Sequence, residues 1–256
     1  MAGIVLENTL HGRRRHLWLS VSADLCVDAL RDLHDIGAAH VPVYNLTKLT
    51  YGPIERQRDP NGGGRIEHGV LFCTYSALVS EQRAGGSRLD QVMQWLGGAV
   101  AEGCILFDES HKAKNLVPDV PEQGEKGVKG ARGARGAQVN KKVSSKTAAA
   151  VSALQRGCPK ARVVYCSAVL AAGVEPTAPY RHRTAPVMRG SHTLEPRRGQ
   201  TGASDVKHMA YMERLGLWGV GTSFNDDGGG FRNFYSSISE GGVGAMELVG
   251  RLARTR

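Results

Sequence analysis

Five short runs of apolar residues alternate along the chain with segments of helical spacing, and this alternation constrains the fold more than any other feature. The runs predict strands at 16–22, 41–46, 69–78, 104–108 and 161–168. Helices are predicted between them at 24–35, 87–96 and 144–155. Strands that alternate with helices form a parallel sheet, and continuous apolar strands suit a sheet covered on both faces. We therefore expect an α/β fold with a mostly parallel sheet and helices on both faces.

Small residues mark the ends of the predicted helices. Gly37 follows the helix at 24–35 and is a candidate C-cap, because glycine accepts the left-handed conformation that ends many helices. Ser144 or Ser145 is the candidate N-cap of the helix at 144–155.

Polar residues follow three of the predicted strands. They are Ser20 to Asp24, Thr74 to Ser76, and Asp108 to His111. In parallel sheets covered by helices, ligands bind beyond the carboxyl ends of the strands. We therefore expect the functional site to be built from these three groups.

Composition narrows the functional classes without choosing one. The 256 residues carry a net charge of +9, which favours a polyanionic partner such as nucleic acid. The same net charge would arise if the basic residues lay in flexible segments and only kept the chain soluble. Charge alone does not decide between these two explanations. No apolar run reaches the roughly 18 residues that a membrane span needs, so no membrane partner is expected. The N-terminus lacks the basic region of a secretory signal.

The five cysteines give no metal-binding pattern. None belongs to a CxxC pair, which argues against zinc. Isolated cysteines within apolar runs behave as small hydrophobic residues and suit a reducing compartment.

The stretch ILFDESHKAKN, from Ile105 to Asn115, carries the chemistry. A carboxylate at the end of a central parallel strand can hold Mg²⁺ through water beside nucleotide phosphates, and the next carboxylate can polarise the attacking water. Asp108 is then the metal carboxylate, Glu109 the water-positioning base, and His111 a link toward nucleic acid. The alternative is that Asp-Glu only opens a helix, where acids suit the positive end of the dipole.

Longer stretches of the chain resemble the strawberry notch family, whose members are superfamily 2 DExH helicase-like transcription regulators. DESHKAKNL resembles the family's motif II, with Ser110 where animal members have Cys. Further matching blocks are RRRHLWLSVSADLCVDALRDLHDIGA, GVLFCTYSALVSE, PKARVVYCSA, TGASDVKHMAYMERLGLWG and GGVGAMELV. The resemblance implies the first RecA-like lobe of a P-loop NTPase.

The resemblance also implies cofactors, partners and further site residues. The full-length family uses ATP and Mg²⁺ to remodel or unwind DNA or RNA. Thr74, Tyr75 and Ser76 lie where such helicases contact the phosphate backbone, although they can also simply end a strand. Transcription or chromatin factors are the implied partners. The nucleus is the implied location, with the cytoplasm as the alternative.

Two departures from the family pattern affect these expectations. The first is that no GxxxxGK[ST] phosphate loop occurs in the 256 residues. In the family this loop runs into a helix that resembles Ala2–Arg15. We therefore expect a lobe that is incomplete at the N-terminus, is inactive alone and does not bind Mg²⁺ or ATP stably by itself.

The second departure lies in motif III, which reads Ser-Ala-Thr-Gly-Ala-Ser in the family. Here Ser167 and Ala168 are separated from Thr201 by residues 169–200. The segment begins with a Val codon and ends with a Gln codon, as an in-frame retained intron would. The alternatives are a retained intron, which we favour, and a genuine surface insertion.

These observations divide the chain at several positions. Residues 1–168 form the partial lobe, with a flexible basic loop at 117–142. The insert at 169–200 is expected to be disordered, 201–249 continue the lobe and 250–256 form a tail.

Two rival functions stay open. One is a non-enzymatic nuclear scaffold that binds chromatin or transcription factors through the same fold. The other is a metal-dependent hydrolase that uses Asp108, Glu109 and His111 directly, although no HxH or HExxH motif supplies further ligands.

Overall fold

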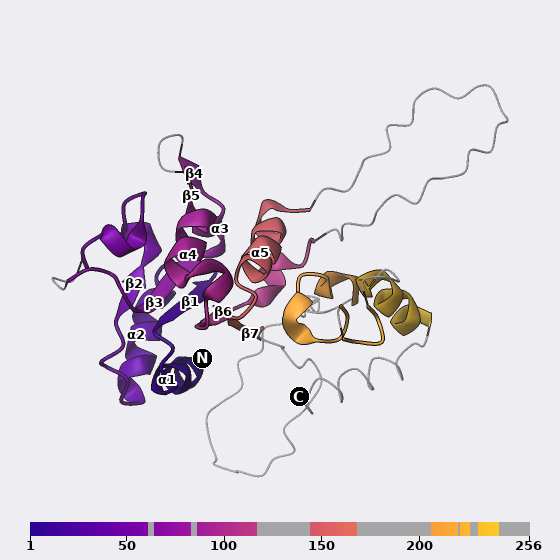
Figure 1. Ribbon diagram of the computed structural model, residues 1–256, viewed down its shortest axis with the longest axis horizontal. Coiled ribbons are helices and arrows are strands. Elements are labelled where there is room, and N and C mark those ends of the chain that lie inside the picture. Colours follow the sequence, from indigo (N-terminus) through magenta and orange to yellow (C-terminus); the bar gives the residue numbers. More distant parts are fainter. Residues whose placement is uncertain are drawn as a thin grey trace, which may run out of the picture.

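Five parallel strands form the main sheet of the protein (Figure 1). The computed structural model describes residues 1–60, 64–82, 86–116, 144–167, 206–219, 221–225 and 230–240. The strands are β1 (Arg15–Ser20), β2 (Val43–Asn45), β3 (Gly69–Thr74), β6 (Cys104–Phe107) and β7 (Arg162–Tyr165). Their order across the sheet is β2–β3–β1–β6–β7, and every neighbouring pair is parallel. The predicted parallel α/β fold is confirmed.

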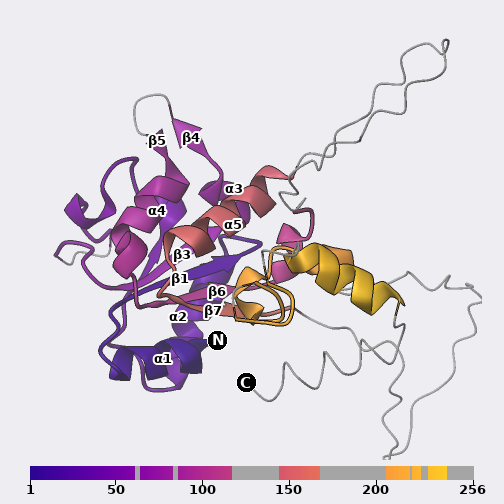
Figure 2. The same cartoon turned by 45° about the vertical axis from the view of Figure 1, so that its right-hand side comes forward.

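Helices cover both faces of this sheet. One face carries α1 (Ala2–Leu10) and α2 (Leu25–Asp35), and the other carries α3 (Tyr75–Leu78), α4 (Arg88–Leu96) and α5 (Lys146–Gly157). Figure 2 shows α4 and α5 on one side of the strands and α1 on the other. The three central strands, β3, β1 and β6, are buried along almost their whole length because both faces are covered, whereas β7 at the edge is exposed or half-buried.

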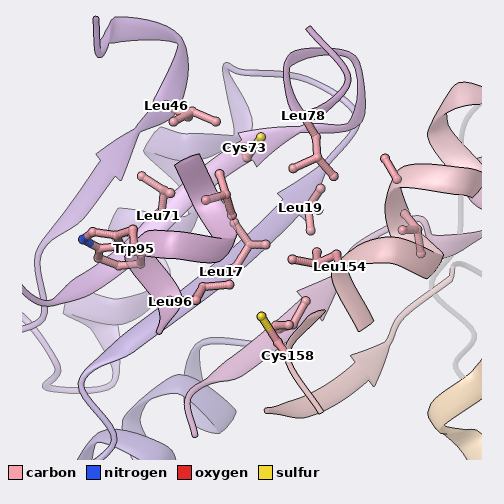
Figure 3. Packing of buried hydrophobic residues seen from close by; sticks show 14 of the residues in the cluster. Leu17, Leu19, Leu46, Leu71, Cys73, Leu78, Trp95, Leu96, Leu154 and Cys158 are labelled. Atoms are coloured by element: carbon pink, nitrogen blue, oxygen red, sulfur yellow. The ribbon is translucent and has the colours of Figure 1, made fainter. Parts of the chain in front are cut away.

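Alternate side chains of each strand enter two different cores. On β1, Leu17 and Leu19 pack with Trp95 of α4 and Leu154 of α5 (Figure 3). Trp18, which lies between them in sequence, enters the core beneath α1 and α2. This separation follows from the two-residue period of a strand.

Smaller elements complete the described fold. The strands β4 (Glu81–Gln82) and β5 (Gly86–Ser87) pair antiparallel in a hairpin that the sequence did not predict. Short 3-10 turns span Leu46–Lys48, Ile54–Arg56, Gly98–Val100, Ser110–Ala113, Val206–Met209 and Glu213–Leu215. A helix over 230–240 packs Phe234 and Ile238 against Trp218 in a separate apolar cluster.

The helix ends agree with the expected capping residues. Gly37 has a φ of 80° just after α2, as a left-handed C-terminal residue should. The Ser145 hydroxyl accepts the amide of Ala148 over 3.2 Å, so Ser145 is the N-cap of α5.

Several predicted boundaries differ from the structure, and two of them are wrong by a turn or more. The strand predicted at 69–78 ends at Thr74, because the Thr74 hydroxyl accepts the Ala77 amide over 3.1 Å and starts α3. The helix implied by the family over Ala2–Arg15 ends at Leu10, because Gly12 turns the chain at a φ of 80° and Arg15 already pairs with Gly69.

Several sequence predictions lie outside the described residues. They concern the basic loop at 117–142, the insert at 169–200 and the tail at 250–256, and the domain boundaries drawn from them stay predictions. Within the described residues, no helix is long and apolar enough to cross a membrane.

Candidate nucleotide site at the carboxyl edge of the sheet

Asp108 follows directly on β6 and lies beside the end of β1. The two strands are neighbours, with Leu19 paired to Phe107, and the Asp108 amide donates to the Leu19 carbonyl over 2.8 Å. The fully buried hydroxyl of Ser20 then donates to Oδ2 of Asp108 over 2.7 Å. Asp108 is half-buried, so its carboxylate is oriented by the fold and still accessible to solvent.

Glu109 lies at a sharp turn between β6 and the 3-10 turn Ser110–Ala113. Its backbone has φ 48° and ψ 48°, which is the left-handed conformation. It is the only residue other than glycine with positive φ in the described part of the chain. This conformation costs an L-residue about 1–2 kcal/mol, so the surroundings must hold it.

His111 joins Glu109 to the end of β7. Its Nδ1 lies 3.1 Å from Oε2 of Glu109 and 3.3 Å from the hydroxyl oxygen of Ser167. A carboxylate can only accept, so Nδ1 must carry a proton to bond to Glu109. The structure thus brings the predicted residues Glu109, His111 and Ser167 together.

The predicted nucleic-acid residues Thr74, Tyr75 and Ser76 differ in exposure. Thr74 is buried and caps α3, and Tyr75 is buried with its hydroxyl donating to the Asp108 carbonyl over 2.8 Å. Ser76 is exposed and lies 3.1 Å from the Thr74 hydroxyl. Their contact with nucleic acid stays a prediction, whereas the contact of Tyr75 with the Asp108 carbonyl is internal to the fold.

The segment over 206–215 also reaches this site. Tyr211 is 2% exposed and donates its hydroxyl to the Ser110 hydroxyl oxygen over 3.1 Å. Its carbonyl accepts the Gln155 side chain over 2.8 Å, which attaches it to α5. Its ring and that of Tyr165 form a T-shaped pair with centroids 6.0 Å apart. Burial raises the pKa of Tyr211, so its hydroxyl keeps its proton at neutral pH.

Cys166 follows directly on β7 and lies beside the turn that carries Glu109. Its amide donates to the Phe107 carbonyl over 2.8 Å, and its carbonyl accepts the Ser110 amide over 2.8 Å. Burial raises the pKa of its thiol, and Asp108 raises it further.

Sequence reasoning found part of this site and missed part. It identified Asp108, Glu109, His111 and Ser167. Ser20 was included only in the polar group after its strand, and Tyr211 only in a block that resembles the family, and neither was given a role of its own. Ala168 and Thr201, the other predicted motif III residues, lie outside the described residues. No group of three or more His, Cys, Asp or Glu that could hold a metal occurs among the described residues.

A family comparison defines the class of protein. The sequence model described as P-loop containing NTP hydrolase pore-1 matches residues 1–185 and 198–255. Together with the parallel sheet, this match makes the chain a P-loop NTP hydrolase domain with a RecA-like α/β fold. The unmatched residues 186–197 fall within the predicted insert at 169–200. No solved structure gives a significant match.

Curated relatives identify the family within that class. Protein strawberry notch of Drosophila melanogaster is 40% identical over 253 residues, and strawberry notch homolog 1 of Gallus gallus is 39% identical over 252. Protein FORGETTER 1 of Arabidopsis thaliana is 38% identical over 249 residues. The chain belongs to the strawberry notch family. These alignments cover 97% of this chain but only 12%, 15% and 14% of the three relatives.

Proposed function

We propose that the chain supplies the Mg²⁺- and water-positioning side of an ATP-hydrolysing site in a helicase-like protein. The observation that carries this proposal is the pair of adjacent carboxylates at the end of β6. Asp108 is oriented by Ser20, and Glu109 is oriented by His111. The two carboxylates at the end of this central strand are held by different partners. They can therefore have different roles, one binding a metal and the other orienting water.

The residues fit a Mg²⁺ ion held beside a nucleotide. Carboxylate oxygen is the ligand type that Mg²⁺ prefers, and in nucleotide sites the ion keeps several waters and takes its other ligands from phosphates. Asp108 would hold it through water, with its carboxylate oriented by the Ser20 hydroxyl. When bound, Mg²⁺ would neutralise negative charge on the phosphates.

Glu109 has the task of orienting the attacking water. Its Oε2 accepts the Nδ1 proton of His111, which restrains the side chain. The same Nδ1 lies 3.3 Å from Ser167, so the contact extends to the end of β7, where motif III begins. Movement of that segment would change the position of the Glu109 carboxylate.

Nucleic acid is the partner that we propose for the ATP-driven work. The net charge of +9 and the exposed Ser76 in α3, two residues beyond β3, support this part of the proposal. Remodelling or unwinding of DNA or RNA in the nucleus, as part of transcription control with chromatin factors, rests on the resemblance to the family.

Phosphate release tests the proposal. The chain is joined at its N-terminus to the phosphate-loop segment of a strawberry notch relative and is assayed with ATP and Mg²⁺, with and without DNA or RNA. Glu109→Gln should lower turnover by about 10²-fold or more and leave nucleotide binding intact. The control is Glu102→Gln, at an exposed residue before β6, which should change neither.

Two outcomes of these assays would contradict the proposed function. Loss of nucleotide binding together with turnover in a folded Glu109→Gln variant would make Glu109 a structural residue. Absence of turnover combined with retained nucleic-acid binding would favour the non-enzymatic scaffold.

A further inference from the structure

The peptide groups on both sides of Glu109 are held by segments that are distant in sequence. The carbonyl of Asp108, which belongs to the peptide before Glu109, accepts the Tyr75 hydroxyl over 2.8 Å. The amide of Ser110, which belongs to the peptide after it, donates to the Cys166 carbonyl over 2.8 Å. Because φ and ψ of Glu109 are rotations of these two peptides, the contacts restrain the left-handed conformation directly.

Tyr211 strengthens the second of these restraints. Its hydroxyl reaches Ser110, which is 1% exposed, so the bond is shielded from water. Its ring and carbonyl are themselves fixed by Tyr165 and Gln155. Tyr211 therefore transmits the position of the segment 206–215 to the residue after Glu109.

Both tyrosines are suited to act as permanent donors. Each is at most 5% exposed. A tyrosine hydroxyl is protonated near neutral pH, because its ordinary pKa is about 10. Both hydroxyls can therefore donate, and each has an oxygen acceptor within hydrogen-bond distance.

We propose that Tyr75 and Tyr211 are positioning residues that hold Glu109 in its left-handed conformation and so keep its carboxylate at His111. A role of this arrangement in catalysis rests on the proposed function, whereas the contacts themselves are features of the structure. Through Tyr211, the segment 206–215 determines whether the water-positioning carboxylate is in place.

Amide hydrogen exchange, followed by NMR on the chain itself, tests the proposal without nucleotide. The reporters are the amides of Ser110, bonded to Cys166, and of Lys112, bonded to the Glu109 carbonyl over 3.0 Å. Tyr75→Phe and Tyr211→Phe each remove one hydroxyl and keep the ring. Each should make both reporters exchange about five- to tenfold faster, as expected for one lost buried hydrogen bond.

A matched control exists in the same chain. Tyr51 donates its hydroxyl to the Ser80 hydroxyl oxygen over 2.8 Å, which is the same chemical pair as Tyr211 and Ser110. Tyr51→Phe should leave both reporters unchanged. Ser110→Ala removes the acceptor of Tyr211 and should accelerate Lys112 as Tyr211→Phe does, which provides a second variant if either tyrosine substitution prevents folding.

A second substitution, at Glu109, tests whether the tyrosines act by holding its left-handed conformation or only by stabilising the structure in general. Glycine adopts the left-handed conformation without the cost that a Cβ imposes. Adding Glu109→Gly to Tyr211→Phe should therefore restore slow exchange, whereas Glu109→Ala, which also removes the carboxylate but keeps Cβ, should not. Unchanged exchange in both tyrosine variants, or equal rescue by Ala and Gly, would overturn the proposal. Absence of ATP turnover would count against the proposed function alone.

Discussion

The hydroxyl of Ser20 donates to Oδ2 of Asp108 across 2.7 Å, and this bond joins the carboxyl ends of β1 and β6. The two residues are 88 positions apart in sequence. Ser20 is fully buried and Asp108 half-buried, so one partner belongs to the core and the other faces the candidate nucleotide site. The core of the sheet thereby orients the carboxylate that we assign to Mg²⁺.

Ser20→Ala should lower the free energy of unfolding by about 1–2 kcal/mol, because a buried hydrogen bond to a charged group is lost. Urea titration measures the change. The control is Ser22→Ala, since Ser22 contacts Asp24 at 3.4 Å on the exposed surface and should contribute less than about 0.5 kcal/mol. Equal effects in the two variants would show that the Ser20 bond adds nothing specific.

Asp108→Asn should raise the Mg²⁺ concentration required for half-maximal ATP turnover by about tenfold or more, since the amide lacks the charge that attracts the ion. The assay is phosphate release during a Mg²⁺ titration of the version that carries a phosphate loop. Asp35→Asn, at the exposed end of α2, should not change the requirement. A normal Mg²⁺ requirement in Asp108→Asn would contradict the assignment of Asp108 as the metal carboxylate.

His16 should make the fold sensitive to acid. It is fully buried, its Nε2 lies 3.2 Å from the Thr9 hydroxyl oxygen, and its Nδ1 accepts the Cys104 amide over 3.2 Å. Burial lowers its pKa from 6.5 to about 4. Between these values the unfolded chain binds a proton that the folded chain does not, so stability falls as the pH drops through this window.

The loss should reach about 3 kcal/mol at most, from the size of the pKa change. Urea titrations at pH 7 and pH 4.5 measure it. His16→Gln should flatten the pH dependence, whereas His11→Gln, at an exposed residue, should retain it. An unchanged pH slope in His16→Gln would show that another group is responsible.

Gly103→Ala should destabilise the protein by about 3 kcal/mol or more, because an added Cβ would lie only 1.6 Å from the Arg15 carbonyl oxygen. Gly3→Ala is the matched change at an open site in α1, where no atom lies within 4 Å of the added Cβ, and it should stabilise by about 0.5–1 kcal/mol. Thermal melts compare the two. A mild effect at Gly103 would mean that β1 and β6 can separate locally.

The sequence by itself determined the class of fold and the identity of the main acidic pair. Short continuous apolar runs, separated by segments of helical spacing, predicted five strands in a parallel sheet, and the structure has them in a single sheet. The Asp-Glu pair was predicted at a strand end because the apolar run stops there. These are local patterns, and local patterns can be read without knowing which segments meet.

The tertiary structure alone decided the contacts that orient this pair. The bond from Ser20 to Asp108 requires β1 to lie next to β6, and the bond from Tyr211 to Ser110 joins residues 101 positions apart. The left-handed conformation of Glu109 is likewise unfavourable for an L-residue, and its neighbours are held by Tyr75, Cys166 and Tyr211, which are all distant in sequence. Strand order and docking are set by the packing of the whole core, so no local pattern of residues encodes them.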